Sequence, residues 1–315
     1  MPHISIVVPV FNETSDMLRE LIRRVDKAVA GITEDYEIIF VDDRGNADVW
    51  KFILSASSHD TKVKGLRLAR NFGQHVAITA GLDHASGDWV VVMDSDLEDR
   101  PEVIPELYAK AREGYDIVFV DRVQRPVSWL YGLTARCFYR VLNALSGQEY
   151  NALQSNFSIL SAKTVKAFRG MRERTRFYGG IVRWIGFRQT SISAVHGDLR
   201  PGSSGYSFFR RARLAIDLIV GFSSRLLYIS IAIGALMATT SFAVGTYIAI
   251  EKLLNPEGIL LGWSSVITAI LFTGGVTNMA IGFVGLYLGR IFEEIKGRPL
   301  YLTDEATTNL QAAPK

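Results

Sequence analysis

Two carboxylates, Asp94 and Asp96, are the residues of this chain whose type and spacing point most directly to chemistry. They follow the apolar run Trp-Val-Val-Val-Met, a short Val-rich segment typical of a strand buried on both faces. Along an extended chain residues i and i+2 point the same way, so we expect both carboxylates to reach one ligand. Two hard oxygen donors suit Mg²⁺ or Mn²⁺, which fills its shell with water and phosphate oxygens. The alternative is a polar strand end that leads into a helix capped near Asp99.

Polar clusters also follow other apolar runs. Three clusters stand where such a run ends: Asn12 with Glu13, Asp42 with Asp43, and residues 71–74. The expected strands are 4–10, 36–41, 63–68, 117–120 and the strand that carries Asp94 and Asp96, and the expected helices are 16–29, 46–57, 75–85 and 102–113. This alternation predicts an α/β protein with a doubly wound, mostly parallel sheet, whose ligands bind outside the carboxyl ends of the strands. All the polar clusters fall at such ends.

Two common phosphate-binding motifs are missing. The first predicted strand is not followed by Gly-x-Gly-x-x-Gly, and the chain has no Gly-x-x-x-x-Gly-Lys-Ser/Thr. The first turn offers Asn and Glu instead, which suit hydrogen bonds to a base or ribose. We therefore expect a metal ion to handle the phosphates.

The chain has 315 residues, of which 48% are hydrophobic, and the apolar residues are unevenly spread. Residues 226–250 and 264–288 contain no charged side chain. Each stretch is about 25 residues long, enough to cross a bilayer with some tilt. Buried core helices are the alternative, but two such stretches in succession, rich in Gly, Ala, Ser and Thr, favour a transmembrane hairpin.

The net charge of +3 gives no reason to expect a nucleic acid partner. The placement of the basic residues is more informative: they precede the first stretch and follow the second, whereas the connection 251–263 holds Lys252 as its only base. The positive-inside rule then puts both termini and the N-terminal domain in the cytoplasm, on the inner face of the cell membrane. Cys137 is the only cysteine, which fits a reducing compartment, and no signal peptide precedes the first predicted strand.

Two further segments read as amphipathic helices. Residues 128–145 and 206–222 carry apolar side chains at helical spacing among arginines. Such helices lie in the membrane interface or pack on the soluble domain, and the second leads directly into a span, which favours the interface. The predicted division is a catalytic domain at 1–205, an interfacial helix at 206–225, the spans within 226–288 and a polar C-terminal segment at 289–315 whose last dozen residues form a loose tail.

The motifs together resemble a known family. Val-Val-Pro-Val-Phe-Asn-Glu, Val-Asp-Asp, Arg-Asn-Phe-Gly-Gln and Met-Asp-Ser-Asp-Leu-Glu-Asp are similar to those of family 2 glycosyltransferases with the GT-A fold, and specifically to the polyprenyl-phosphate glycosyltransferases. Residues 173–177, 186–190, 285–294 and 298–301 resemble the membrane-anchored bacterial branch of that group. The likeness covers nearly the whole chain.

The resemblance implies a membrane-bound enzyme that transfers a sugar, with inversion, from a nucleotide diphosphate sugar to undecaprenyl or dolichyl phosphate. Its implied partners are these two substrates and the lipid bilayer, and a homo-oligomer is compatible with it. Its cofactor would be Mg²⁺ or Mn²⁺, held by Asp94 and Asp96. The implied nucleotide-sugar site comprises Pro9, Phe11, Glu13, Asp43, Ser95 and Arg122, and the implied lipid-phosphate site comprises Arg122 and Arg200.

The chain departs from the family pattern at two positions. Asn156 stands where related enzymes carry the acidic residue usually assigned as the catalytic base, and Gly205 stands where they carry a lysine. An amide cannot take a proton. The acceptor is a phosphate monoester with a second pKa of about 6, however, so general-base help is worth less than it is for a sugar hydroxyl.

Two other functions remain as alternatives. A polysaccharide synthase would carry Gln-x-x-Arg-Trp, whereas Arg183-Trp184 is preceded here by Gly180, and two spans are few for a channel. A noncatalytic membrane protein that binds nucleotide sugars would explain Asn156 and Gly205, but not the intact pair of aspartates.

Overall fold

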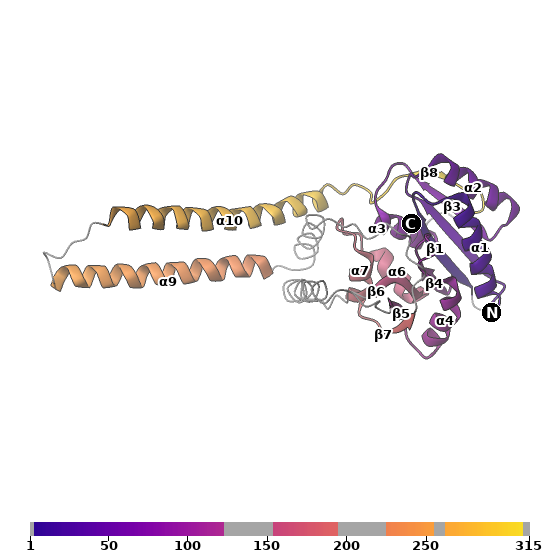
Figure 1. Cartoon of the computed structure of the whole chain (residues 1–315), viewed down its shortest axis with the longest axis horizontal. Coiled ribbons are helices and arrows are strands. Elements are labelled where there is room, and N and C mark those ends of the chain that lie inside the picture. Colours follow the sequence, from indigo (N-terminus) through magenta and orange to yellow (C-terminus); the bar gives the residue numbers. More distant parts are fainter. Residues whose placement is uncertain (1–2, 123–153, 195–224, 255–261, 311–315) are drawn as a thin grey trace. The chain divides into compact units, whose positions relative to one another are not determined.

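The computed structural model describes residues 3–122, 154–194, 225–254 and 262–310. These residues fall into two compact units. Residues 3–122, 154–194 and 298–310 form the first, and residues 225–254 and 262–297 belong to the second. Figure 1 shows the elements of both.

Among the described residues of the first unit, eight strands form one sheet in the order β7-β5-β6-β4-β1-β2-β3-β8. The pairs β1/β2, β1/β4, β2/β3 and β5/β7 are parallel, whereas β6 is antiparallel to β4 and β5, and β8 is antiparallel to β3. The strands are β1 (Ile4–Val10), β2 (Tyr36–Asp42), β3 (Val63–Leu68), β4 (Trp89–Val92), β5 (Ile117–Arg122), β6 (Gln154–Ser161), β7 (Gln189–Ala194) and β8 (Thr303–Ala306). The predicted mostly parallel α/β sheet is confirmed.

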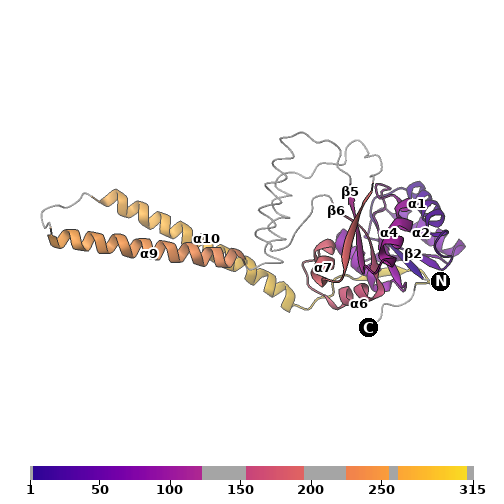
Figure 2. The same ribbon diagram turned by 90° about the horizontal axis from the view of Figure 1, so that it is seen from below.

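Helices cover both faces of this sheet (Figure 2). Buried apolar side chains of β1 and β2 pack with those of α1, α2 and α4 on one face, and α3, α6 and α7 lie on the other. The helices are α1 (Ser15–Val29), α2 (Ala47–His59), α3 (Gln74–His84), η1 (Pro101–Val103), α4 (Ile104–Arg112), α6 (Ala162–Gly170) and α7 (Tyr178–Ile185).

Local sequence explains where several elements begin and end. The β-branched run of β1 is buried along its whole length, as expected of a central parallel strand. Thr14 and Asn46 cap α1 and α2, because their side chains accept hydrogen bonds from backbone N–H groups of the first turn. Gly186 ends α7 in the left-handed conformation, with φ of 70°.

Strand β4 is shorter than predicted. It ends at Val92, opposite Val7 of β1, and Asp94 and Asp96 lie beyond it in a bent segment where Leu97 has φ of 64°. The expectation that strand alternation would align the two carboxylates is therefore wrong. Beyond the end of the strand, the Asp94 N–H donates a hydrogen bond to the side chain of Asp99.

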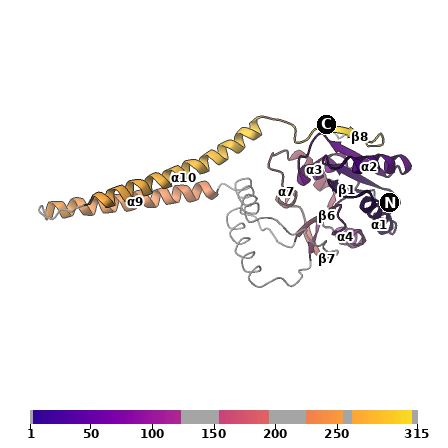
Figure 3. The same cartoon turned by 45° about the horizontal axis from the view of Figure 1, so that its top comes forward.

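The expectation of a loose C-terminal tail is also wrong for the residues described. Thr303–Ala306 forms β8, which pairs with β3 as an edge strand (Figures 1 and 3). Thr307 is buried, and Asn309 donates to the backbone oxygens of Thr61 and Val63. The segment is ordered because the exposed edge of β3 supplies the hydrogen-bonding groups that it needs.

The second unit contains two long helices, α9 (Arg225–Leu254) and α10 (Trp263–Ile295). Within the described residues, Leu227–Val244 and Phe272–Ile295 are long and apolar enough to cross a membrane, judged by length and composition. Helix α10 continues past the predicted end of the span at Leu288. The predicted amphipathic helices 128–145 and 206–222 lie outside the described residues.

Candidate active site

The candidate site lies at the carboxyl ends of β1 and β4, beyond the last residues that pair these two strands. The Met93 N–H donates to the Val7 carbonyl, so the backbone groups of Val7 face β4, and by alternation those of Pro9 face the same side. Proline has no N–H to offer there, and β4 has already ended. Pro9 itself is buried in β1. Strands β2 and β4 flank β1 on opposite sides, so this gap is the switch point at which ligands of doubly wound sheets bind.

Glu13 joins the ends of these two strands. Its Oε2 accepts a hydrogen bond from the Phe11 N–H at 2.7 Å, and its Oε1 accepts one from the Ser95 hydroxyl, also at 2.7 Å. Ser95 is buried, whereas the Phe11 ring is 40% exposed. The carboxylate thus orders the turn after β1 and holds the residue that stands between Asp94 and Asp96.

Asp94 is half-buried and Asp96 is exposed. The Gln74 side-chain amide, at the start of α3, donates to Asp94 Oδ1 at 2.7 Å. Asp96 Oδ1 accepts from the Glu98 N–H at 3.0 Å, which tightens the turn after it. Both carboxylates therefore lie at the carboxyl edge of the sheet, but neighbouring loops, and not strand geometry, orient them.

Asp43 anchors the loop that brings Gln74 to the site. It is buried, and its Oδ1 and Oδ2 accept from the N–H groups of Phe72 and Gly73, each at 2.7 Å. The predicted contact between Asp43 and a nucleotide stays a prediction. The structure gives the carboxylate a definite positioning role, since it fixes the chain immediately before Gln74.

Asp99 connects residues 94–96, which we call the aspartate segment, to β6. This buried carboxylate accepts from the Asp94 N–H and from the Ser155 hydroxyl, both at 3.1 Å. The N-caps of η1 and α4 are Arg100 and Val103, so a helix does begin near Asp99, as the structural alternative for this segment expects. The bond to Ser155 ties the aspartate segment to the residue next to Asn156.

Asn156 lies at the same edge of the sheet. It stands two residues before Ser158, which pairs with Val92 at the end of β4. Because β6 is antiparallel to β4, Asn156 lies beyond the end of β4, beside the segment that carries Asp94. The side chain is half-buried.

Of the two predicted phosphate-binding arginines, the structure describes Arg122 but not Arg200. Arg122 ends β5, where its backbone pairs with Ala194 of β7. Strands β4 and β5 run in the same direction, since both are antiparallel to β6, so Arg122 also belongs to the carboxyl edge. Arg200 lies outside the described residues, as does Gly205.

Burial dominates the electrostatics around the end of β2. It raises the pKa of Asp43, although the N–H groups of Phe72 and Gly73 oppose the shift. Burial likewise raises the pKa of Asp42. The hydrogen bond from the Gly45 N–H and the charge of Arg67 both act to lower this pKa, but burial outweighs them. The Nε atom of Arg67 lies 3.1 Å from Asp42 Oδ2. These two carboxylates serve as internal anchors of the loops.

The side chains present fit a magnesium-type ion better than a metal caged by protein. Within the described part of the chain, no group of three or more His, Cys, Asp or Glu side chains could hold a metal ion. Mg²⁺ takes one or two protein carboxylates when substrate phosphates and water complete its shell. Asp94 and Asp96 meet that description.

Two positioning residues, Gln74 and Asp99, were not predicted as site residues. Gln74 was visible as a polar residue after the third strand, but its partner lies 20 positions later. In the sequence Asp99 indicates only the start of a helix nearby. Only the fold shows which groups these side chains contact.

Comparison with known proteins points to one family of enzymes. The profile of the family described as Glycosyl transferase family 2 matches residues 5–175. The SfII prophage-derived bactoprenol glucosyl transferase of Shigella flexneri is 36% identical over 307 residues, which cover 95% of this chain and 96% of the relative. The undecaprenyl-phosphate 4-deoxy-4-formamido-L-arabinose transferase of Klebsiella pneumoniae is 30% identical over 314 residues, 99% of this chain and 96% of the relative.

A solved structure shares the fold. Glucosyl-3-phosphoglycerate synthase from Mycobacterium tuberculosis, in complex with Mn²⁺, UDP-glucose and phosphoglyceric acid, matches with a TM-score of 0.51 and 19% identity, over 70% of this chain and 79% of that one. At this identity the likeness concerns the fold alone. Together with the family match it confirms the predicted GT-A fold.

Proposed function

Because this chain belongs to glycosyl transferase family 2, we propose that it transfers a sugar from a nucleotide diphosphate sugar to a polyprenyl phosphate at a membrane. The observation that carries the proposal is the convergence of Glu13, Ser95, Gln74 and Asp94 at the switch point between β1 and β4. Relatives whose names state transfer to bactoprenol or undecaprenyl phosphate match this chain over nearly its full length, α9 and α10 included.

In the proposed mechanism the nucleotide lies over the end of β1, against the exposed Phe11 ring. Glu13 and Asp43 keep the surrounding loops in place. Asp94 and Asp96 would hold Mg²⁺ or Mn²⁺, which neutralises the charge that develops on the departing diphosphate. The described residues thus supply preorganised positioning at the donor.

The acceptor phosphate attacks the anomeric carbon from the face opposite the leaving diphosphate, which inverts the configuration. Arg122 and Arg200 are the proposed ligands of the phosphates. Asn156, at the edge beside Asp94, orients the acceptor rather than deprotonating it. A phosphate monoester with a second pKa of about 6 is already largely ionised at neutral pH.

We further propose that α9 and α10 anchor the enzyme in the cell membrane, with the catalytic unit and both termini in the cytoplasm. The helices have the length and composition of spans, and the connecting stretch is poorer in basic residues than the flanks. This arrangement gives the soluble donor and the lipid acceptor access to one site.

The test is a transfer assay with purified full-length protein, undecaprenyl phosphate, Mg²⁺ or Mn²⁺ and a panel of radiolabelled nucleotide sugars. We expect one donor to give a lipid-linked product that carries a single sugar. Asp96→Asn should reduce the rate at least about 100-fold, since metal-borne charge stabilisation amounts to several kcal/mol.

Glu113→Gln, an exposed change at the end of α4, serves as the matched control and should leave the rate unchanged. A long polymeric product would favour the polysaccharide synthase instead. Metal-dependent donor binding without any transfer would favour a noncatalytic binding protein. Either result, or an Asp96→Asn variant as active as the wild type, would refute the proposal.

A further inference from the structure

The chain ends in a segment that returns to the catalytic unit after α10. We call residues 298–310 the C-terminal strap. Its strand β8 pairs antiparallel with β3, with Ala306 opposite Leu66 and Thr303 opposite Leu68. Because β3 ends at Leu68, the beginning of the strap lies at the carboxyl edge of the sheet, where the candidate site is, and its end lies toward the opposite edge.

At the carboxyl edge the strap contacts two loops of the candidate site. The Leu302 carbonyl accepts from the Ala69 N–H at 2.8 Å. Asp304 forms an ion pair with Arg44. Glu305 lies 3.6 Å from Arg67 Nη1, and it also accepts from the indole N–H of Trp50 at 2.8 Å.

Apart from the bond to Trp50, these contacts involve residues that lie next to, or pair with, the residues that hold the site loops. Arg44 directly follows Asp43 and has φ of 61°, a conformation that costs a residue other than glycine about 1–2 kcal/mol and needs outside support. Arg67 pairs with Asp42. Ala69 precedes the loop 70–74, whose amides bind Asp43 and whose last residue, Gln74, binds Asp94.

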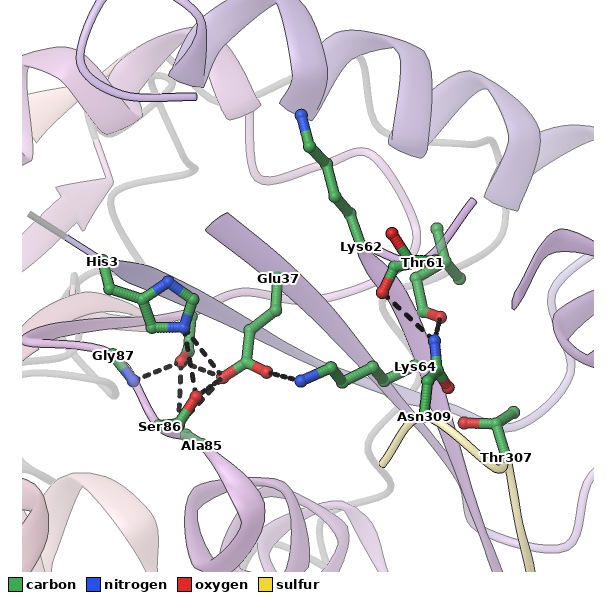
Figure 4. A network of polar contacts seen from close by, with 12 residues as sticks. His3, Glu37, Thr61, Lys62, Lys64, Ala85, Ser86, Gly87, Thr307 and Asn309 are labelled. Atoms are coloured by element: carbon green, nitrogen blue, oxygen red, sulfur yellow. Dashed lines mark hydrogen bonds and ion pairs between the residues drawn. The ribbon is translucent and has the colours of Figure 1, made fainter. Parts of the chain in front are cut away.

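The other end of the strap has different partners. The Thr307 hydroxyl accepts from the Gly65 N–H at 2.9 Å. The Asn309 side-chain amide donates to the carbonyls of Thr61 and Val63, at the start of β3 (Figure 4). These contacts hold the strap to the sheet, but they touch no loop of the candidate site.

We propose that Asp304 and Glu305 are positioning residues for the donor site, which fix the loop 42–46 from the C-terminal strap, Asp304 through Arg44 and Glu305 through the Arg67–Asp42 pair. This inference rests on the proposed function and deepens it. The segment that follows the second candidate span is then part of the donor-binding apparatus, and the polypeptide after α10 sets the affinity for the nucleotide sugar.

The test compares variants at the two ends of the strap in the full-length protein. Asp304→Asn and Glu305→Gln, singly and together, should raise the KM for the nucleotide sugar, by roughly five- to tenfold in the double variant. The KM for the polyprenyl phosphate and kcat should stay within about twofold. Asp304→Glu keeps the charge and should restore most of the donor affinity.

Thr307→Val and Asn309→Ala are the matched controls at the other end. They should lower the Tm and leave the donor KM unchanged. A purely structural strap would give the same pattern at both ends, and that result would overturn the inference, as would a double variant with the wild-type donor KM. The Asp304 side chain is 39% exposed. We therefore expect the single Asp304→Asn variant to fold normally, so that it tests the positioning role of Asp304 separately from stability.

The outcome for the wild type separates the two proposals. Transfer by the wild type together with an unchanged donor KM in the Asp304 and Glu305 variants refutes only the role of the strap. A wild type that neither binds nor uses any nucleotide sugar refutes both.

Discussion

Glu13 shows how much of the site depends on one carboxylate. Its two oxygens bind the Phe11 N–H and the Ser95 hydroxyl, and so they connect the turn after β1 to the aspartate segment after β4. An amide in its place would keep only one accepting oxygen and would present an N–H₂ group to a second donor. The acidic residue is therefore required by the geometry, apart from any contact it makes with a ligand.

Asn156 differs from Glu13 in that its residue type excludes a chemical role, that of a general base. Its amide cannot accept a proton, yet it lies at the edge beside Asp94, where the proposed mechanism brings the acceptor. Chemistry at this position is consistent with an ionised phosphate nucleophile, which needs orientation more than deprotonation. A sugar hydroxyl as acceptor would need the missing base.

Glu37 supports a prediction about pH. It is buried near the amino ends of β1 and β2, where it accepts from Ser5, Ser86 and Lys64 (Figure 4). Burial alone would raise its pKa, but these hydrogen bonds, led by that of Lys64, outweigh burial and lower the pKa from 4.5 to about 2. The ionised group therefore stabilises the fold fully above pH 4.5, and this stabilisation is lost as the pH falls toward 2.

We expect Glu37→Gln to lower the free energy of unfolding at pH 7 by on the order of 3 kcal/mol, with a difference from the wild type that shrinks below pH 4.5. Denaturant unfolding of the detergent-solubilised protein between pH 7 and pH 3 measures this. Glu34→Gln, an exposed neighbour, is the control. A Glu37→Gln deficit that is the same at pH 3 as at pH 7 would contradict the assignment.

At the scale of elements, the close approach of two strand ends decides the shape of the site. The turn after β2 passes beneath the end of β1 at Gly45, where a Cβ would lie 1.4 Å from the Phe11 carbonyl oxygen. The Gly45 N–H also donates to Asp42 at 2.8 Å. Only glycine allows the turns after β1 and β2 to lie this close together.

Gly45→Ala should therefore move the backbone of both turns. We expect a loss of roughly 2–4 kcal/mol in the free energy of unfolding together with weaker nucleotide-sugar binding. Gly31→Ala is the matched control, since nothing lies within 4 Å of a Cβ at that position. Thermal unfolding measures the change in stability, and donor titration measures the change in binding. If the two variants had the same stability and the same donor affinity, the turns after β1 and β2 would not be in tight contact at Gly45.

At the scale of the whole molecule, the chain leaves the first unit for the second and then returns to the first. The first unit is built from residues on both sides of the second unit in sequence, and the strap closes its sheet after the two long helices. The proposed orientation requires an even number of crossings, because both flanks of the hairpin then lie on one side of the membrane.

This requirement predicts the behaviour of topology reporters in a bacterial host. Green fluorescent protein fused after Lys315 should fluoresce, and alkaline phosphatase at the same place should be inactive. Alkaline phosphatase inserted between residues 255 and 261 should be active. An active phosphatase at the C-terminus would rule out the proposed arrangement of α9 and α10.

Much of this protein could be predicted from the sequence alone, wherever the determining pattern is local. β1 has the predicted bounds, because a β-branched run between polar residues specifies a buried strand without reference to the rest of the chain. β3 also has the predicted bounds. The two long apolar helices follow from composition in the same way. The polar clusters at strand ends predict the candidate site, since parallel strands collect their carboxyl ends at one edge.

The tertiary structure alone decided how that site is held together. One partner of Asp99, Ser155, comes from β6, and the partner of Arg44, Asp304, lies 260 residues later in the chain. β8 is only four residues long, and its sequence becomes a strand because β3 offers it an open edge. Contacts between residues so far apart depend on how the whole sheet is ordered, and no local periodicity or propensity encodes them.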